Sequence, residues 1–336
     1  MIQSAIQRVE SGQDLSIDEV AETFEQIICG GCTEDDIARW LLALNRKGPS
    51  VGEVAGAALA LRRKMTPILS SRPELLDTCG TGGDQLHTFN ISTAAALVTA
   101  AAGVPVAKHG NRAASSRSGS ADVLAVLGVN IEADVASVEH CLDELGICFC
   151  FAPLLHNAMR HVAPVRKKLG VPTIFNILGP LINPAGASRQ LLGVGRAELQ
   201  PLLAGALVLL GTARSVVVHG SDGLDEVTLT GATEVAEATG QVRHFQWNPA
   251  DFGLGSIRLK AIQVSGPSQS AAIIRGVLAG QPGPARDIVV ANAAAALWTA
   301  GKAPSPAACA GLAAEAIDTA AASDLLARLI AKSHGK

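Results

Sequence analysis

The first seventy residues carry apolar positions at the spacing of helices. Behind Ser16, apolar residues recur at steps of three and four through residues 20–28, and a similar stretch at 54–64 follows Ser50. Each serine has a glutamate three residues later, which is the spacing of a capping box at a helix N-terminus. The pattern predicts several short helices without a strand, and hence a small helical domain over residues 1–72.

The pattern changes after this point, where short apolar stretches alternate with alanine-rich ones at helical spacing. Strands are expected at residues 75–78, 104–107, 147–151 and 216–219, helices at 91–102 and 121–127, and a surface hairpin or loop at 240–255. Strands and helices in alternation predict a mainly parallel sheet flanked by helices. We therefore expect an α/β fold, in which the helical domain is joined through a segment around residues 160–190 to a larger α/β domain over residues 73–336.

The composition fits a folded chain of 336 residues, which is roughly two domains at about 150 residues each. Hydrophobic residues make up 48% and charged residues 17%, so enough apolar surface is available for a core and a disordered chain is excluded. The richest apolar stretch, residues 94–107, contains Pro105 and is shorter than the roughly 18 residues that a membrane span needs. We therefore expect no membrane partner.

Charge and residue usage argue against nucleic acid as a partner and against secretion. The net charge is −3 and tyrosine is absent, so neither a basic surface nor aromatic stacking platforms are expected. The seven cysteines are an odd number, and the first residues lack a basic region followed by an apolar one. These features favour a cytoplasmic protein without a disulfide framework.

A glycine-rich loop after the first expected strand is the strongest chemical feature. Gly80, Gly82 and Gly83 allow a ligand to approach the backbone, and their N–H groups can form a concave anion site. Residues 90–93 then open a helix, whose N-terminus offers free N–H groups and hydroxyls to a second phosphate. A flexible turn is the plain alternative. The glycine spacing does not match the dinucleotide-binding fingerprint.

Three further clusters could bind charged ligands. Residues 108–120 combine cations, glycines and hydroxyls, as a polyphosphate clamp does, although a solvated loop has similar composition. Asp225 and Glu226 follow a strand and fit Mg²⁺, while a surface turn is the better interpretation of that motif alone. His156 and Arg166 belong to a basic segment whose guanidinium groups could hold a carboxylate, or simply form a solvated helix face.

Taken together and in this order, these motifs resemble the anthranilate phosphoribosyltransferase family over essentially the whole chain. The matching segments are residues 80–84, 88–93, 108–112, 118–122, Arg166 with 175–184, and 222–226. The resemblance implies transfer of the phosphoribosyl group of phosphoribosyl diphosphate (PRPP) to the amine of anthranilate. This reaction is the second step of tryptophan biosynthesis from chorismate, and it yields N-(5-phosphoribosyl)anthranilate and diphosphate. The resemblance further implies an active site between the two domains, Mg²⁺ as cofactor without nicotinamide or flavin, and a homodimer formed mainly through the helical domain.

The resemblance also assigns roles to individual residues. The PRPP site would comprise Gly80, Gly82, Gly83, Asp84, Thr88, Asn90, Ile91, Ser92, Thr93, Lys108, His109, Gly110, Asn111, Arg112, Ala113, Ala114, Ser115, Ser116 and Ser120. The anthranilate site would comprise Gly80, Asn111, His156, Met159 and Arg166. The ligands of Mg²⁺, with two ions per subunit, would be Ser92, Asp225 and Glu226. Lys108, Asn111 and Arg166 are expected to be the catalytic residues.

The chain departs from the family pattern at Gln85, Ala125, Asn157, Met159 and the pair at 195–196, none of which removes an expected phosphate, Mg²⁺ or carboxylate contact. A pyrimidine nucleoside phosphorylase, which shares the fold, is expected to be longer and to lack the acidic pair. A non-catalytic relative that binds nucleic acid is expected to have a basic groove and a degraded glycine loop. Neither alternative fits this sequence as well.

Overall fold

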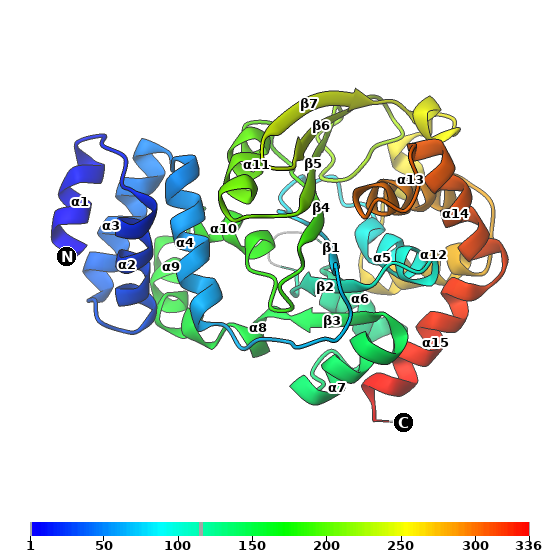
Figure 1. Ribbon diagram of the computed structural model, residues 1–336, viewed down its shortest axis with the longest axis horizontal. Coiled ribbons are helices and arrows are strands. Elements are labelled where there is room, and N and C mark those ends of the chain that lie inside the picture. Colours follow the sequence, from blue (N-terminus) through cyan, green and yellow to red (C-terminus); the bar gives the residue numbers. More distant parts are fainter. Residues whose placement is uncertain (1, 114–116, 336) are drawn as a thin grey trace.

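Four helices form a bundle at the N-terminal end of the computed structural model, which describes residues 2–113 and 117–335 (Figure 1). They are α1 (Ile2–Glu10), α2 (Ile17–Ile28), α3 (Glu34–Lys47) and α4 (Val51–Lys64). Both predicted capping boxes are present: Ser16 accepts a hydrogen bond from the Glu19 N–H, and Ser50 accepts one from the Glu53 N–H. The helical prediction for this part of the chain is confirmed.

A later segment returns to pack against this bundle. It contains α8 (Ala152–Leu155), η2 (Asn157–His161), α9 (Ala163–Leu169), α10 (Phe175–Leu178) and η3 (Gly179–Leu181). The ring of Phe175 lies 5.4 Å from that of Phe24 in α2, and Val162 and Val165 are buried in the same cluster. Residues far along the sequence therefore complete the core of the N-terminal bundle.

Seven strands form one sheet in the order β3-β2-β1-β4-β5-β6-β7 (Figure 1). The strands are β1 (Leu76–Gly80), β2 (Val106–Gly110), β3 (Ile147–Phe151), β4 (Arg189–Gly193), β5 (Arg214–Gly220), β6 (Thr233–Ala238) and β7 (Val242–Trp247). β1 to β5 are parallel to one another, whereas β6 is antiparallel to β5 and β7 is antiparallel to β6. The mainly parallel sheet is confirmed, and the hairpin expected at 240–255 includes β7 at the sheet edge. The strand expected at 104–107 begins two positions later, and β4 and β6 were not predicted.

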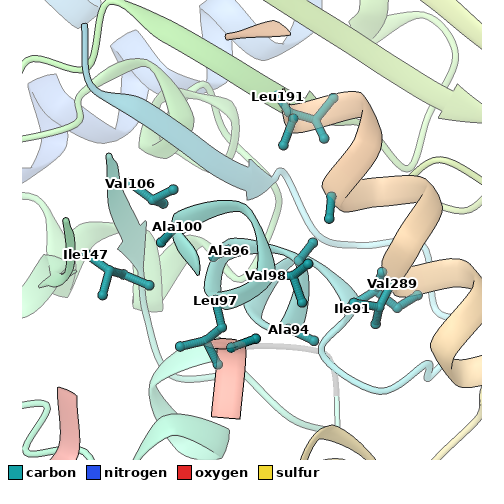
Figure 2. Packing of buried hydrophobic residues seen from close by; sticks show 14 of the residues in the cluster. Ile91, Ala94, Ala96, Leu97, Val98, Ala100, Val106, Ile147, Leu191 and Val289 are labelled. Carbon is teal, nitrogen blue, oxygen red and sulfur yellow. The ribbon is translucent and has the colours of Figure 1, made fainter. Parts of the chain in front are cut away.

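Helices cover both faces of the sheet. Besides those above, they are α5 (Ile91–Ala101), α6 (Ser120–Leu127), α7 (Val135–His140), η1 (Cys141–Leu145), α11 (Leu199–Leu209), η4 (Pro249–Phe252), η5 (Leu259–Ile262), α12 (Pro267–Leu278), α13 (Pro284–Thr299), α14 (Pro306–Asp318) and α15 (Ala321–Ser333). Figure 2 shows the alanine-rich α5 beside Val106 of β2, Ile147 of β3 and Val289 of α13. Small side chains on α5 allow this close helix–sheet packing. Within the described residues, no helix is both long and apolar enough to cross a membrane.

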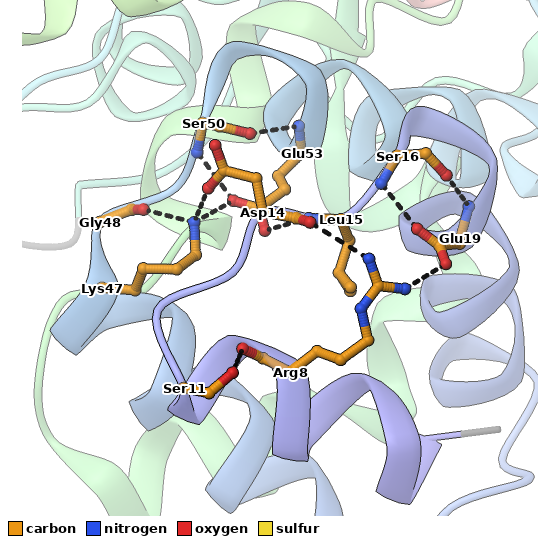
Figure 3. A network of polar contacts seen from close by, with 10 residues as sticks. All are labelled: Arg8, Ser11, Asp14, Leu15, Ser16, Glu19, Lys47, Gly48, Ser50 and Glu53. Carbon is orange, nitrogen blue, oxygen red and sulfur yellow. Dashed lines mark hydrogen bonds and ion pairs between the residues drawn. The ribbon is translucent and has the colours of Figure 1, made fainter.

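A buried carboxylate organises the bundle (Figure 3). Glu53 in the first turn of α4 is 0% exposed. It accepts hydrogen bonds from the Leu15 N–H at 3.2 Å, the Ser50 N–H at 2.8 Å and the Lys47 ammonium at 2.7 Å. One side chain thus joins the start of α4, the end of α3 and the turn before α2. Removing a buried carboxylate with this many partners strongly destabilises a protein, because its hydrogen-bond donors lose their acceptor.

We predict that Glu53→Ala lowers the free energy of unfolding by about 3 kcal/mol, since it leaves two N–H groups and Lys47 without this buried acceptor. Urea unfolding followed by circular dichroism measures the change. The matched control, Glu22→Ala, removes an exposed glutamate from α2 and should change stability by less than about 0.5 kcal/mol. Equal effects of the two variants would contradict the role assigned to Glu53.

Candidate active site

The carboxyl ends of β1, β4 and β5 meet at one edge of the sheet, where the glycine loop and the acidic pair lie in contact. The Gly82 N–H donates to Asp225 Oδ2 at 2.9 Å, and the Thr81 N–H donates to the Gly193 carbonyl at 2.9 Å. A Cβ atom at Gly80 would lie 2.6 Å from Asp225 Oδ2, and one at Gly193 would collide with the Asp225 carbonyl. The close approach therefore requires glycine at both strand ends.

The N-terminus of α5 brings further predicted residues to the same edge. The Ser92 N–H donates to Glu226 Oε1 at 2.9 Å. Lys108, which is 3% exposed, donates to the Thr78 carbonyl at 2.5 Å and to Ser92 Oγ at 3.3 Å. Ser92, Lys108 and Glu226 thus form one hydrogen-bonded cluster, as parallel strand ends in one sheet would place them.

Burial and like charge dominate the electrostatics of this cluster. Burial, together with the neighbouring Asp84 charge, raises the pKa of Asp225 to about 7. Burial together with the Asp225 charge raises the pKa of Glu226 to about 8. Burial lowers the pKa of Lys108, while the surrounding acids oppose that shift. The carboxylates crowd one another in a half-buried site, which favours binding of a cation there.

These residues fit a magnesium ion better than a fully protein-coordinated metal. Across residues 2–113 and 117–335, no group of three or more His, Cys, Asp or Glu side chains is arranged to hold a metal. The donors present are the carboxylates of Asp225 and Glu226 and the hydroxyl of Ser92, all hard oxygen ligands. Mg²⁺ is commonly bound by one or two carboxylates, with substrate phosphates and water as its other ligands. Asp84 was assigned only to PRPP, and its electrostatic coupling to Asp225 was not foreseen from the sequence.

Several other predicted PRPP residues have structural partners. Asn90 stands at the N-cap position of α5 but does not cap it: its amide donates to the Ser118 carbonyl, and its Oδ1 accepts from Ser118 and Ser270. Ile91 is buried in the core, so only its backbone is open to a ligand. The Thr93 hydroxyl is buried and has no hydrogen-bond partner in the described part of the chain.

The remaining loop residues surround the ends of β1 and β2. Gly82 and Gly83 have φ angles of +68° and +86°, in the left-handed region that glycine favours. Thr88 forms an isolated bridge with Gln263, and Gly110 ends β2 beneath Ser120.

Several polar groups of the loop after β2 form hydrogen bonds and an ion pair with the loop itself and with the first turn of α6. The Asn111 side chain accepts from the Arg112 N–H at 2.7 Å, and the Ala113 N–H donates to Asp122 at 2.9 Å. Arg112 also forms an ion pair with Asp122 at 3.3 Å. Ser120 donates to the Asn111 carbonyl at 3.4 Å. The predicted positions Ala114, Ser115 and Ser116 lie outside the described residues.

A pair of buried histidines links β2 to the segment that packs on the bundle. His109 Nδ1 lies 3.0 Å from the Gly179 carbonyl, and His109 Nε2 lies 3.0 Å from His156 Nε2. Because the carbonyl can only accept, His109 carries its proton on Nδ1, and His156 Nε2 donates to His109. Burial lowers the pKa of His109 to about 4 and that of His156 to about 3, so both rings are neutral near pH 7.

Arg166 lies on α9, beside the bundle. Its guanidinium lies 5.4 Å from the centre of the Phe175 ring, and Nη2 donates to Asn176 Oδ1 at 3.4 Å. Burial lowers the pKa of Arg166, which has no carboxylate partner among the described residues. It borders an open hollow of about 440 Å³, and Met159 lies on η2 in the same segment. Among the predicted anthranilate residues, the Met159 N–H donates to the His156 carbonyl at 3.0 Å, whereas within the described ranges no hydrogen bond joins Arg166 to Gly80 or Asn111.

Two family models match this chain. A model described as "Glycosyl transferase family, helical bundle domain" matches residues 3–65, and one described as "Glycosyl transferase family, a/b domain" matches residues 72–323. The chain is thus a glycosyl transferase of the kind that combines a helical bundle with an α/β domain. Within this class it belongs to the anthranilate phosphoribosyltransferase family, as the named relatives show.

Proteins named anthranilate phosphoribosyltransferase match it along nearly its full length. The one from Rhodospirillum rubrum is 53% identical over 98% of this chain and 95% of that protein, and the one from Rhodopirellula baltica is 50% identical over 97% and 95%. The crystal structure of the Thermus thermophilus enzyme has a TM-score of 0.93 at 44% identity, covering 98% of this chain and 99% of that one. The Saccharomyces cerevisiae enzyme in complex with PRPP and Mg has a TM-score of 0.90 at 29% identity, covering 100% and 98%. The family resemblance is confirmed.

We predict that the His109–His156 pair makes the protein sensitive to mild acid. The folded chain holds both imidazoles neutral, whereas unfolding returns them to a pKa near 6.5. The free energy of unfolding therefore includes their full contribution above pH 6.5. This contribution is lost as the pH falls toward the pKa values of the folded state, and His109 alone accounts for about 3 kcal/mol of the loss. Urea unfolding between pH 7 and pH 4.5 measures this slope.

The double variant His109→Gln/His156→Gln should flatten that pH dependence. His244→Gln is the matched control, because His244 is an exposed histidine on β7, and it should keep the wild-type slope. If the double variant keeps the full slope, the acid sensitivity does not come from this pair.

Proposed function

We propose that this chain transfers the phosphoribosyl group of PRPP to the amine of anthranilate, releasing diphosphate and forming N-(5-phosphoribosyl)anthranilate, as the second step of tryptophan biosynthesis. One observation carries the proposal: the glycine loop and the N-terminus of α5 both donate N–H groups to a half-buried acidic pair, Asp225 and Glu226. Backbone N–H donors beside these carboxylates provide both ligand types that a Mg²⁺–diphosphate needs.

The chain's own groups would act mainly on the leaving diphosphate. As the bond from C1 of the ribose breaks, negative charge builds on the diphosphate, and groups aimed at that charge lower the barrier. Lys108 is buried and already oriented toward Ser92, so little reorganisation is needed. The backbone N–H groups of the glycine loop would bind the phosphoryl oxygens. Mg²⁺, when bound by Asp225, Glu226 and Ser92 as two ions per subunit, would neutralise the diphosphate charge.

Anthranilate, the acceptor substrate, would be bound by the segment that packs against the helical bundle. A planar guanidinium matches a carboxylate, which fits Arg166 to the carboxylate of anthranilate. The arylamine is already neutral near pH 7, so positioning rather than a strong base supplies most of the acceleration. His156 and Met159 lie in the segment before Arg166, and Asn111 and Gly80 would contact the acceptor from the sheet side. A yeast relative is described in complex with 4-fluoroanthranilate, which supports an acceptor of this shape.

Three further properties belong to the proposal. The helical domain would extend over residues 1–72 and the α/β domain over 73–336, a division supported by the break between the two matched family models. A homodimer would form mainly through the helical domain. A cytoplasmic location would fit the odd number of cysteines.

We predict that the purified protein consumes anthranilate, seen as a loss of its fluorescence, only when PRPP and Mg²⁺ are both present. Asp225→Asn/Glu226→Gln should lower the rate by at least about 100-fold, because the carboxylates that bind the cation are neutralised. Glu234→Gln changes an exposed glutamate on β6 and should leave the rate unchanged. Stable fluorescence with folded wild-type protein would rule out anthranilate as the acceptor.

We predict that Arg166→Ala raises the KM for anthranilate by about 10- to 100-fold and changes kcat much less, since a charge-assisted contact to the substrate carboxylate is lost. Steady-state kinetics at saturating PRPP measures both constants. Lys168→Ala, an exposed lysine on the same helix, is the control and should match the wild type. An unchanged KM in Arg166→Ala would remove this residue from the acceptor site.

A further inference from the structure

A second cavity lies at the opposite edge of the sheet from the candidate active site. It has a volume of about 130 Å³ and is bordered by Arg62 of α4, Pro180, Asn183, Gly186, Ala187, Ser188, Gln190, Leu207, Leu210, Gly211, Thr212 and Ser215. β4 and β5 begin here, whereas the glycine loop and the acidic loop lie at the carboxyl ends of β1 and β5. The cavity therefore lies between the bundle and the amino ends of two central strands, away from the acidic pair.

Arg62 brings an unneutralised charge to this cavity. Its Nε donates to the Leu181 carbonyl at 2.7 Å, but its two Nη groups have no acceptor among the described residues, and none of the ion pairs there includes it. Burial lowers the pKa of Arg62, because the guanidinium is partly withdrawn from water. The next residue, Arg63, is exposed and forms an ion pair with Glu25 at 2.9 Å. Thus a carboxylate neutralises Arg63, whereas none neutralises Arg62 among the described residues.

Backbone donors border the same space. Gly186 has a φ of +64°, and the following N–H groups of Ala187 and Ser188 make no hydrogen bond within the described ranges. Successive N–H groups after a left-handed residue can form a concave anion site. The cavity lining therefore offers a guanidinium and two backbone N–H groups as donors that are not yet used.

The other polar side chains of the lining already form hydrogen bonds within the protein. The Thr212 hydroxyl donates to the Ser188 carbonyl at 3.0 Å and lies 2.6 Å from the Ser215 hydroxyl, so Ser215 must donate to Thr212. The amide of Gln190 donates to the Pro180 carbonyl at 2.7 Å, and that of Asn183 donates to the Ala107 carbonyl at 2.8 Å. No acidic residue borders the cavity in the described part of the chain. The groups that remain available in this lining are hydrogen-bond donors, which favour an anion as the ligand.

We propose that this cavity binds a small oxyanion, a phosphate or a carboxylate group, through the Arg62 guanidinium and the N–H groups of Ala187 and Ser188. The volume corresponds to about four water molecules at about 30 Å³ each, which suits one such group and excludes a nucleotide. The oxyanion would join α4 of the bundle to the loop that enters β4. Binding should therefore stabilise the junction between the bundle and the sheet, independently of the proposed activity.

The test is calorimetric titration of inorganic phosphate, without Mg²⁺, into the full chain. All variants carry Lys108→Gln to weaken phosphate binding in the candidate active site. We expect Lys108→Gln alone to bind one phosphate per chain, and the added Arg62→Gln to weaken that binding at least tenfold. The added Arg63→Gln is the matched control and should not change it. A parallel titration with acetate shows whether a carboxylate or a phosphate is preferred.

Two results would overturn the proposal. One is undiminished binding after Arg62→Gln. The other is no binding to Lys108→Gln at millimolar phosphate, which would mean that the cavity holds only water. If Arg62→Gln does not fold, Arg62→Lys keeps the charge but loses the planar fork, and it should still weaken binding several-fold. Unchanged affinity in that variant would also exclude Arg62 as the anion-binding group.

Discussion

The contact between the acidic loop after β5 and the glycine loop after β1 sets the geometry of the candidate active site. These two strands are not neighbours, because β4 lies between them in the sheet. The loop must therefore cross the end of β4 to reach β1, and it does so over Gly193, where a side chain would collide with the Asp225 carbonyl. At the far side of the crossing, a Cβ atom at Gly80 would lie 2.6 Å from the Asp225 carboxylate oxygen Oδ2, so glycine leaves room for that side chain. Two glycines on adjacent strands thus permit one carboxylate to accept from the Gly82 N–H.

This crossing has an electrostatic consequence. It places Asp225 and Glu226 where they are half-buried and where Asp84 adds a further negative charge, so their pKa values rise to about 7 and about 8. The groups that oppose this repulsion are the Gly82 and Ser92 N–H groups and the Lys108 ammonium, which is itself destabilised by burial. A divalent cation bound to the carboxylates would lower this repulsion further, and an anion bound near the N–H groups would be stabilised by them. The same packing that brings these carboxylates together therefore favours a metal–phosphate ligand.

The sequence predicted those parts of the structure that depend on short stretches of chain. Capping boxes at Ser16 and Ser50, the glycine loop and the strands around it are local features, because hydrogen bonding and turn geometry act over a few residues. The crossing over Gly193 depends on strand order, which no local pattern contains, and β4 itself was not predicted. The coupling of Asp84 to Asp225 and the pairing of His109 with His156 join distant segments and were missed for the same reason. The family resemblance supplied the residues of the proposed site, but not their mutual contacts.

The two sides of the proposed site are joined through buried contacts that cross the sheet. Alternate residues of β5 belong to different cores: Val216 and Val218 pack with α5 and α13, whereas Val217 packs with α11 and the bundle. The segment that carries Arg166 packs on the bundle, yet it is also tied to the strands through the Gly179 carbonyl at His109 and the Pro180 carbonyl at Gln190. Two carbonyl groups in adjacent positions thus hold the acceptor side against β2 and β4. Because positioning is proposed to supply much of the acceleration, these carbonyl contacts would help to hold the acceptor side in the geometry that the reaction needs.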